Sequence, residues 1–305
     1  MHNSWHIEAT SKCTLDCPLC DRTWFYKTFK KRLLHEINID HLDYFFSKTK
    51  YARVSLCGNN GDPIYHSKFH SLCETLKKNN CEIHITTNGS ARSVNWWREL
   101  GVVLTENDSI TFSIDGLEDT NHIYRKNADW DSIIKGIEIL ENESTVPKCW
   151  KFIVFDHNQH QIDQAKQLSQ KLGFVEFRIE HSDRWLPEES NTFKPAAQFI
   201  DPKIEHQKKV IADPDYFVEI DPFCIKNNKP SNQIYIDAEG YFYPFCWMAS
   251  YRYKMKSIFS PKALGLNIKG ITEDDIFKNK EVINFFKDIR KTPNECCKLK
   301  CGKQK

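Results

Sequence analysis

Three cysteines lie close together near the start of the chain, at Cys13, Cys17 and Cys20 in the run CTLDCPLC. Thiolates are soft ligands that bind iron–sulfur clusters, zinc or copper(I), and three on one short loop converge readily on one metal centre. A four-iron four-sulfur cluster normally takes four cysteine ligands. Three cysteines therefore predict a cluster with one iron open to another ligand, or a distant fourth cysteine.

Zinc is the competing interpretation of this loop. Zinc sites usually pair one C-x2-C with a second nearby pair of cysteines or histidines, and no such pair follows shortly after Cys20. Three unligated thiols are the remaining alternative. The spacing favours an iron–sulfur cluster and leaves both alternatives open.

Composition limits the function classes. The 305 residues carry 43 basic and 41 acidic side chains, and this net charge of +2 gives no electrostatic footprint for nucleic acid or an anionic membrane. The start lacks the basic and apolar runs of a signal peptide, and no apolar stretch reaches transmembrane length. We therefore expect a cytoplasmic protein whose twelve cysteines are reduced thiols or metal ligands.

Strand and helix patterns alternate along residues 4–180. Period-two apolar patterns predict strands, and apolar stripes predict helices, with Asp40 as one cap and Gly101 as one stop. The predicted strands are residues 4–10, 51–57, 81–87, 109–115, 148–155 and 174–180, and the predicted helices are residues 38–50, 68–79, 90–100, 129–141 and 158–172. This order predicts an α/β fold, a partial (β/α)6 barrel of parallel strands.

Several of these strands alternate apolar and polar residues, although parallel strands buried on both faces usually read as continuous apolar runs. If the apolar faces meet the helices, the polar faces line an interior cavity. The candidates for substrate contact are then His6, Glu8, His84, Arg178 and Glu180. A half-solvated antiparallel sheet is the alternative, although helix-length connections between the strands disfavour it. Cys57, Cys73, Cys81 and Cys149 lie in predicted strands or helices and are expected to be small core residues.

The turns after the strands form a second set of candidates, because ligands of parallel α/β folds bind at the carboxyl ends of the strands. After the second strand comes CGNNGDP, where Gly58, Asn60 and Gly61 allow a tight backbone path and Asp62 and Pro63 fix the exit. Its free backbone groups could meet an amino acid. An ordinary turn is the alternative.

Three further turns carry polar residues. Thr87 and Asn88 follow the third strand and could bind a ribose or a carboxylate, although Asn88-Gly89 is also a common turn dipeptide. The fourth strand ends in FSIDG with Ser113 and Asp115, and Arg125 follows with a planar fork that suits a carboxylate. Asn158 follows the fifth strand, where it could also cap the next helix.

The CxxxCxxC spacing and the order of these turns resemble the radical S-adenosylmethionine (radical SAM) enzymes. The resemblance implies that the open iron of a 4Fe-4S cluster is chelated by the amino and carboxylate groups of S-adenosylmethionine. It also implies that GNNGDP, a variant of the family motif, holds the methionine amino group. Ser113, Asp115 and Arg125 would contact the ribose and the carboxylate, and Asn158 the adenine side. Leu19 departs from the family, which often has an aromatic residue before the third cysteine.

A second cysteine group lies near the end of the chain. Cys224 precedes a predicted hairpin, QIYIDAEGYFYPF, and Cys246 follows it. A predicted helix over residues 272–290 leads to CCKLKC. This order resembles the Twitch domain, the short form of the SPASM extension, and implies one auxiliary 4Fe-4S cluster. The implied ligands are Cys224, Cys246, Cys297 and Cys301, with Cys296 as the alternative to Cys297. Four thiolates also suit zinc.

These observations divide the chain into a core of residues 1–181, a bridging segment of residues 182–215 and an auxiliary cluster domain of residues 216–305. The resemblance implies that an electron from the first cluster, supplied by a donor such as flavodoxin or ferredoxin, splits S-adenosylmethionine into methionine and a 5′-deoxyadenosyl radical. The radical takes a hydrogen atom from an unactivated carbon, which predicts an oxidoreductase-type enzyme.

Two questions about function stay open in the sequence. The short leader before Cys13 favours a small-molecule substrate, and modification of a peptide or protein side chain is the close alternative. A non-catalytic iron–sulfur or zinc-binding module is the alternative of another class, and it would not need the turns that resemble a cofactor site.

Overall fold

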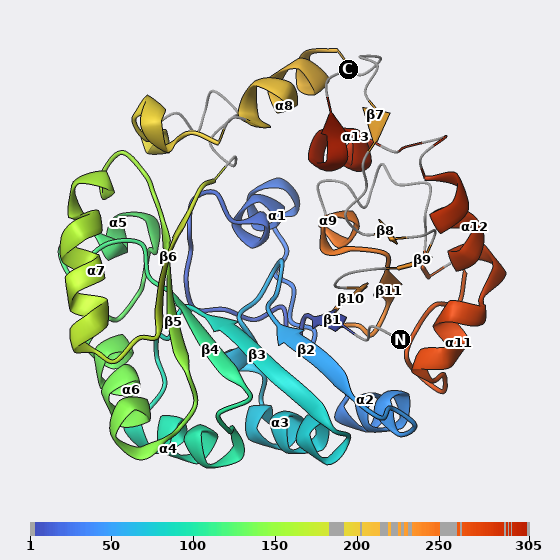
Figure 1. Cartoon of the computed structure of the whole chain (residues 1–305), viewed down its shortest axis with the longest axis horizontal. Helices are drawn as coiled ribbons and strands as arrows, with labels where there is room; N and C mark the ends of the chain where they lie inside the picture. The colour runs from blue at the N-terminus through green and yellow to red at the C-terminus, as the bar shows by residue number, and fades with distance from the viewer. Residues whose placement is uncertain are drawn as a thin grey trace.

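The computed structural model describes residues 4–182, 192–201, 203–213, 219–220, 225–226, 229–230, 234–250, 261–262, 264–289, 291, 293 and 295–303. Six parallel strands lie side by side in chain order. They are β1 (Ser4–Ile7), β2 (Ala52–Leu56), β3 (Cys81–Thr87), β4 (Ser109–Ser113), β5 (Lys148–Ile153) and β6 (Glu176–Glu180). The sheet curls without closing (Figure 1). The predicted partial barrel is confirmed, and the antiparallel alternative is wrong.

Helices cover the outer side of this sheet (Figure 1). They are α2 (Ile39–Phe46), α3 (Phe69–Lys78), α4 (Val94–Val103), α6 (Trp130–Glu143) and α7 (Ile162–Lys171). On the inner side lies α1 (Asp21–Phe29), directly after the cysteine loop. Short elements join the units: η1 (Pro63–Tyr65), α5 (Asn121–Tyr124), η2 (Gln159–Gln161), η4 (Ala197–Phe199) and α8 (Lys203–Ala212).

The C-terminal hairpin extends the main sheet. Strand β10 (Ile234–Ile236) pairs in parallel with β1, and β11 (Phe242–Tyr243) pairs antiparallel with β10. The remaining described elements are β7 (Glu219–Ile220), β8 (Ile225–Lys226), β9 (Lys229–Pro230), α9 (Cys246–Ala249), α11 (Glu273–Lys278), α12 (Lys280–Asp288), α13 (Glu295–Cys301) and β12 (Gly302–Lys303). The C-terminal hairpin therefore pairs with the first strand of the sheet.

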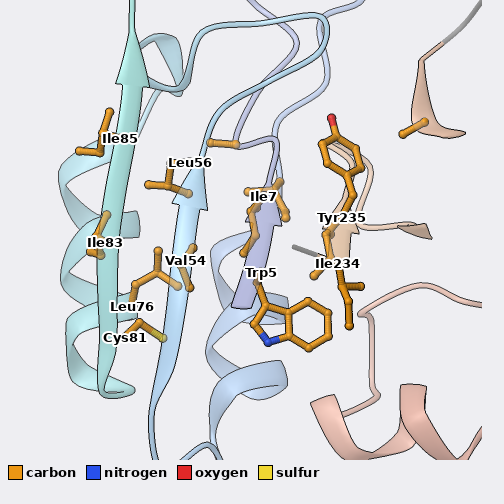
Figure 2. Close-up of a cluster of buried hydrophobic side chains, with 14 of the residues drawn as sticks. Trp5, Ile7, Val54, Leu56, Leu76, Cys81, Ile83, Ile85, Ile234 and Tyr235 are labelled. Atoms are coloured by element: carbon orange, nitrogen blue, oxygen red, sulfur yellow. The ribbon is translucent and has the colours of Figure 1, made fainter. Parts of the chain in front are cut away.

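The core lies between the sheet and the outer helices. Apolar side chains from β1, β2, β3 and β10 gather there (Figure 2), and Trp5, Val54 and Ile83 are fully buried. Burying such side chains contributes roughly 1.5–3 kcal/mol each. The alternate residues of the strands face inward, so the sheet presents polar side chains to its concave side. None of the described helices is both long and apolar enough to cross a bilayer.

Some predicted boundaries are wrong, for local reasons. Asn38, rather than Asp40, caps α2, since its side chain accepts a hydrogen bond from the His41 amide. Gly101 lies inside α4, which Ser93 caps. The helix predicted over residues 272–290 is two helices, because Asn279 ends α11 in an extended conformation and caps α12 with its side chain.

Candidate active site

The cysteine loop, residues 13–20, connects the first strand to α1 and is ordered by its own backbone. The Cys20 amide donates to the Cys17 carbonyl at 3.2 Å, and the Leu15 amide donates to Cys13 Sγ at 3.4 Å. Leu15 and Leu19 are buried in a small apolar cluster that includes Tyr124 and Phe155. The loop is thus anchored by apolar packing, and Cys17 belongs to the same apolar cluster.

A cavity of about 380 Å³ opens at the carboxyl ends of the strands. All three cysteines of the loop line it. The other predicted residues that line it come from separate turns and strand ends: Gly58, Asn60, Gly61, Asp62, Thr87, Asn88, Ser113, Arg125 and Glu180. The fold therefore brings the cysteine loop and most of the predicted cofactor residues to one place.

The glycines after β2 are required by close packing. A Cβ on Gly61 would lie 2.0 Å from the Thr10 carbonyl oxygen, and one on Gly58 would lie 2.6 Å from the Gly61 carbonyl oxygen. The buried Glu8 carboxylate holds this loop from behind, accepting the amides of Asn60 at 2.6 Å and Gly61 at 3.1 Å. Burial raises the pKa of Glu8. Glu8 thus positions the loop.

Asp62 ties this loop to the turn after β3. Its carboxylate accepts the Thr87 hydroxyl at 2.8 Å, the Asn88 amide at 2.6 Å and the Asn88 side-chain amide at 2.5 Å. It also caps η1, which begins at Pro63. Burial raises the pKa of Asp62 to about 6. The Asn88 side chain in turn lies 3.7 Å from Cys13 Sγ, so Asp62 orders groups next to the cysteine loop.

Arg125 lines the cavity wall and forms an ion pair with the buried Asp115. Arg125 Nε donates to Asp115 Oδ2 at 2.6 Å, and Asp115 Oδ1 accepts the Ile153 amide at 2.8 Å. Burial opposes the charge of Arg125, but the Asp115 carboxylate and the nearby Cys17 thiol hold the pKa of Arg125 above its ordinary value. Arg125 is therefore a permanent cation at the cavity wall, and a guanidinium suits a carboxylate ligand.

Asn158 supports this wall and is fully buried outside the cavity lining. Its side chain donates to the Asp115 carbonyl at 3.1 Å and the Ile153 carbonyl at 2.9 Å, and accepts the Phe155 amide at 2.7 Å. In this structure Asn158 orders the turn after β5. A contact with adenine stays a prediction.

The cysteine loop suits a cluster better than a single ion. Burial raises the pKa of Cys13 to about 12 and that of Cys17 to about 11, and a bound cationic metal centre would favour the thiolates. Among the residues that the structure describes, no three Cys, His, Asp or Glu side chains lie close enough to hold one metal ion. The cysteines of a four-iron cluster bind separate irons and are spaced more widely. The soft ligands around one cavity fit such a cluster.

Comparison with known protein families matches residues 7–166 to the Radical SAM superfamily. The chain belongs to this superfamily. The matched range holds the cysteine loop and every turn that resembles the S-adenosylmethionine site, so the resemblance seen in the sequence is confirmed at the level of the superfamily. A search of curated protein sequences finds no match.

Solved structures of radical SAM proteins share the fold. SuiB of Streptococcus suis bound to S-adenosylmethionine gives a TM-score of 0.66 at 13% identity, over 99% of this chain and 71% of SuiB. The protein anSMEcpe with bound AdoMet gives 0.59 at 14%, over 98% and 88%. BtrN in complex with AdoMet and 2-DOIA gives 0.50 at 13%, over 98% and 92%. At these identities the likeness shows the fold alone.

The five candidates for substrate contact lie in different places. Glu180 lines the cavity. His84 bonds Ser109 Oγ at 2.7 Å and Glu82 at 2.6 Å, and Arg178 pairs with Glu176 at 2.6 Å. His6 bonds the Cys57 carbonyl and packs against Tyr235. Glu8 lies behind the glycine loop. Of the five candidates, the structure brings only Glu180 to the cavity lining. Each of the other four side chains contacts a partner within the protein.

Several lining residues escaped the sequence analysis. Lys151 lines the cavity from the inner face of β5, and the alternation of KCWKFI marks it as an inward residue. Trp247 comes from α9, and no local pattern places it there. Cys57, expected in the core, also lines the cavity because it follows the last residue of β2. Cys73 and Cys81 do lie in the core, whereas Cys149 is half-buried.

The second cysteine group is described in part. Cys246 begins α9, and its carbonyl accepts a hydrogen bond from the Asn59 side chain at 2.8 Å. Cys297 and Cys301 lie one turn apart on α13 and are buried. Lys300 Nζ lies 3.9 Å above the Trp247 ring, which joins α13 to α9. Cys224 and the side chain of Cys296 lie outside the described residues, so the auxiliary ligand set stays a prediction.

Proposed function

We propose that the protein reductively cleaves S-adenosylmethionine and uses the resulting radical to remove a hydrogen atom from an unactivated carbon of a polar small molecule. One observation carries this proposal: the three cysteines, the glycine loop and Arg125 line the same cavity. A metal-binding module without catalysis would not need an ordered amino-acid site beside its metal.

The chain's own residues have separate tasks in this proposal. When bound, the cluster supplies the electron that splits S-adenosylmethionine into methionine and the 5′-deoxyadenosyl radical. The backbone of residues 58–61, held by Glu8 and Asp62, binds the methionine amino group. Arg125, fixed by Asp115, binds the carboxylate, and Ser113 binds the ribose. This preorganisation holds the ligand so that the radical forms beside the substrate.

Two charged side chains support a polar substrate. Lys151 on β5 and Glu180 on β6 line the cavity on neighbouring strands, two positions apart in register. Among the described residues, neither has an ion-pair partner within 4 Å. Both side chains are partly buried, and a charge that is partly removed from water is stabilised by a partner. A small molecule with an ionic group and hydroxyl or amino groups would supply partners for both side chains.

An auxiliary cluster on Cys224, Cys246, Cys297 and Cys301 completes the proposal. The support is that α9 and α13 meet at Trp247, which itself lines the cavity. Such a cluster would accept one electron from the substrate radical, which makes the net reaction an oxidation. Residues 216–305 form the auxiliary domain, residues 1–181 the core and residues 182–215 the bridge. Reduced thiols and a low-potential electron donor suit a cytoplasmic location.

A peptide substrate is the second candidate, and two solved neighbours favour it. SuiB has been solved bound to its precursor peptide SuiA, and anSMEcpe with AdoMet and the Cp18Cys peptide. In this alternative, Lys151 and Glu180 would contact side chains or backbone groups of the peptide.

The test is anaerobic reconstitution followed by a deoxyadenosine assay with a panel of charged metabolites and a panel of short peptides. We expect deoxyadenosine above the substrate-free rate with a metabolite, and loss of that stimulation in Lys151→Met and Glu180→Gln. Lys135→Met, at an exposed position of α6, is the matched control. Stimulation by peptides alone would replace the first candidate by the second. Zinc in place of iron, with no cleavage, would leave a metal-binding module.

A further inference from the structure

A second hollow lies beside the cysteine loop, and its lining shares only Arg22 with the lining of the candidate active site. Its volume is about 300 Å³. We name it the basic hollow; its lining residues are Asp16, Pro18, Arg22, Thr23, Tyr26, Lys27, Lys31, Arg32, Leu33 and Lys126. Asp16 and Pro18 lie between the cysteines in sequence, and Arg22 lines both the hollow and the cavity. The hollow therefore adjoins the segment that carries the cysteines, and we call this side of the segment the outer side of the cysteine loop.

Positive charge is concentrated in this hollow. Lys27, Lys31, Arg32 and Lys126 are exposed, and among the described residues none of them forms an ion pair. The acid of the hollow, Asp16, is engaged by Arg22 at 3.1 Å and by the Asn127 side chain at 3.2 Å. Since the whole chain carries a net charge of only +2, this is a local excess. It attracts an acidic partner.

Apolar groups accompany the charges. Tyr26 is 44% exposed, Phe29 37% and Leu34 65%, all on α1 or the segment that follows it. The Arg32 guanidinium lies 5.3 Å from the centre of the Tyr26 ring. Protein interfaces are enriched in exposed aromatic residues and arginine. The surface therefore has features of a protein-docking site as well as a charge.

We propose that the basic hollow docks a small acidic one-electron carrier protein, such as a reduced flavodoxin, against the outer side of the cysteine loop. This inference rests on the proposed function. In the docked complex one electron leaves the reduced flavin, which is oxidised by one electron. The cluster held by Cys13, Cys17 and Cys20 is reduced by that electron, and no heavy atom is transferred. The loop is short and anchored, so docking on its outer side brings the carrier close to the cluster.

The test compares two sources of electrons in one charge-reversal variant, Lys27→Glu, Lys31→Glu and Arg32→Glu together. With reduced flavodoxin and low salt, we expect deoxyadenosine formation to fall about tenfold or more, because reversed charges slow association. With dithionite, a small reductant that needs no docking, the rate stays within about twofold of wild type. The control variant reverses Lys135, Lys166 and Lys171, which are exposed on α6 and α7, away from α1 in Figure 1.

Direct binding gives a readout that does not depend on turnover. We expect oxidised flavodoxin to bind the wild type and the control variant in titration calorimetry, with affinity that falls as salt rises. The charge-reversal variant loses this binding. A carbodiimide, which joins amines to carboxylates, links Lys27 or Lys31 to flavodoxin in the wild type.

Three outcomes separate the possibilities. Equal flavodoxin-driven rates and equal affinities in the charge-reversal variant and the wild type overturn the docking site. So does an RNA oligonucleotide that binds the hollow tightly while flavodoxin does not bind. No deoxyadenosine from the wild type even with dithionite overturns the proposed function instead, and the flavodoxin titration then still decides whether the hollow docks an acidic protein.

Discussion

The two cysteine groups are built in opposite ways. The first is a single loop, in which Cys13, Cys17 and Cys20 are ordered by hydrogen bonds between near neighbours and by packing of Leu15 and Leu19. In the second, Cys246 and the pair on α13 lie on separate elements that meet through the Trp247–Lys300 contact. One segment carries the candidate ligands of the first group, whereas those of the second group depend on contact between separate elements. We therefore expect the first group to tolerate changes elsewhere in the chain better than the second group does.

The two regions nevertheless meet at the glycine loop. Tyr235 of β10 donates its hydroxyl to Glu8 at 2.8 Å, and Glu8 holds the amides of Asn60 and Gly61. Asn59 reaches the Cys246 carbonyl from the same loop. Changes in the C-terminal region should thus affect the glycine loop, although less than changes at Glu8 itself.

The largest expected effect comes from removing each cysteine group separately. Cys13→Ala, Cys17→Ala and Cys20→Ala together should lower reconstituted iron from about eight to about four atoms and abolish deoxyadenosine formation. Cys246→Ala, Cys297→Ala and Cys301→Ala together should also lose about four irons yet keep dithionite-driven cleavage of S-adenosylmethionine. Iron and sulfide counting with a deoxyadenosine assay measures both. Loss of cleavage in the C-terminal variant would contradict the independence of the first group.

A pair of glycines gives the next largest contrast. Gly61→Ala places a Cβ 2.0 Å from a backbone oxygen and must displace the loop that we propose binds the methionine amino group. A displacement of about 1 Å costs roughly 100-fold in rate. A Cβ on Gly265 in the C-terminal region would meet nothing within 4 Å, although its φ of +64° strains an alanine by about 1 kcal/mol. Gly265→Ala should therefore lower stability slightly and leave the deoxyadenosine rate unchanged. Equal deoxyadenosine rates in Gly61→Ala and Gly265→Ala would contradict the requirement for glycine in the loop after β2.

One buried acid in each region, Asp62 and Glu273, allows the two regions to be compared through the pH dependence of stability. Burial raises the pKa of Asp62 to about 6, above its unfolded value of 3.8, so the folded state holds a proton that the unfolded state releases between about pH 4 and 6. Stability contributed by this proton is complete below pH 4 and is lost as pH rises through 6. The stability of wild type relative to Asp62→Asn should therefore fall by up to about 3 kcal/mol from pH 4 to 7.

Glu273 of α11 provides the matched acid in the C-terminal region. Burial raises its pKa too, and it accepts the Trp5 indole at 3.3 Å and the Thr49 hydroxyl at 3.0 Å. Urea unfolding of the metal-free protein at several pH values measures the free energy of unfolding. The stability of wild type relative to Glu273→Gln should also fall as pH rises, as it does relative to Asp62→Asn. The deoxyadenosine assay should distinguish them, since Asp62 orders the active site and Glu273 does not. If the stability of wild type relative to Asp62→Asn rose with pH, the raised pKa of Asp62 would be contradicted.

The sequence predicts this molecule best where neighbours in the chain are neighbours in space. The cysteine spacing, the glycine loop and the alternating strands are local patterns, and they were sufficient for the partial barrel and for most of the cavity lining. Lys151 obeyed the same alternation. The placement of Trp247 and the contact of Tyr235 with Glu8 depend instead on the pairing of β10 with β1, which no local pattern encodes. The prediction that Glu8 contacts substrate rests on the alternation of the first strand, and no local pattern predicts its hydrogen bonds to the glycine loop.

The smallest effect on activity is expected from a change in the hydrogen bond that connects the C-terminal hairpin to the glycine loop through Glu8. Tyr235→Phe removes one hydrogen bond from the buried Glu8 carboxylate and leaves the Asn60 and Gly61 amides in place. Because a hydrogen bond to a charged group contributes about 1.5–3 kcal/mol, stability should fall by that order. The KM for S-adenosylmethionine should rise by less than about tenfold, since two of the donors remain to hold the loop. Glu8→Ala, which removes the acceptor of both backbone amides, should raise the KM further. Steady-state deoxyadenosine kinetics would rank the two, and a larger effect of Tyr235→Phe would mean that the hairpin, rather than Glu8, holds the loop.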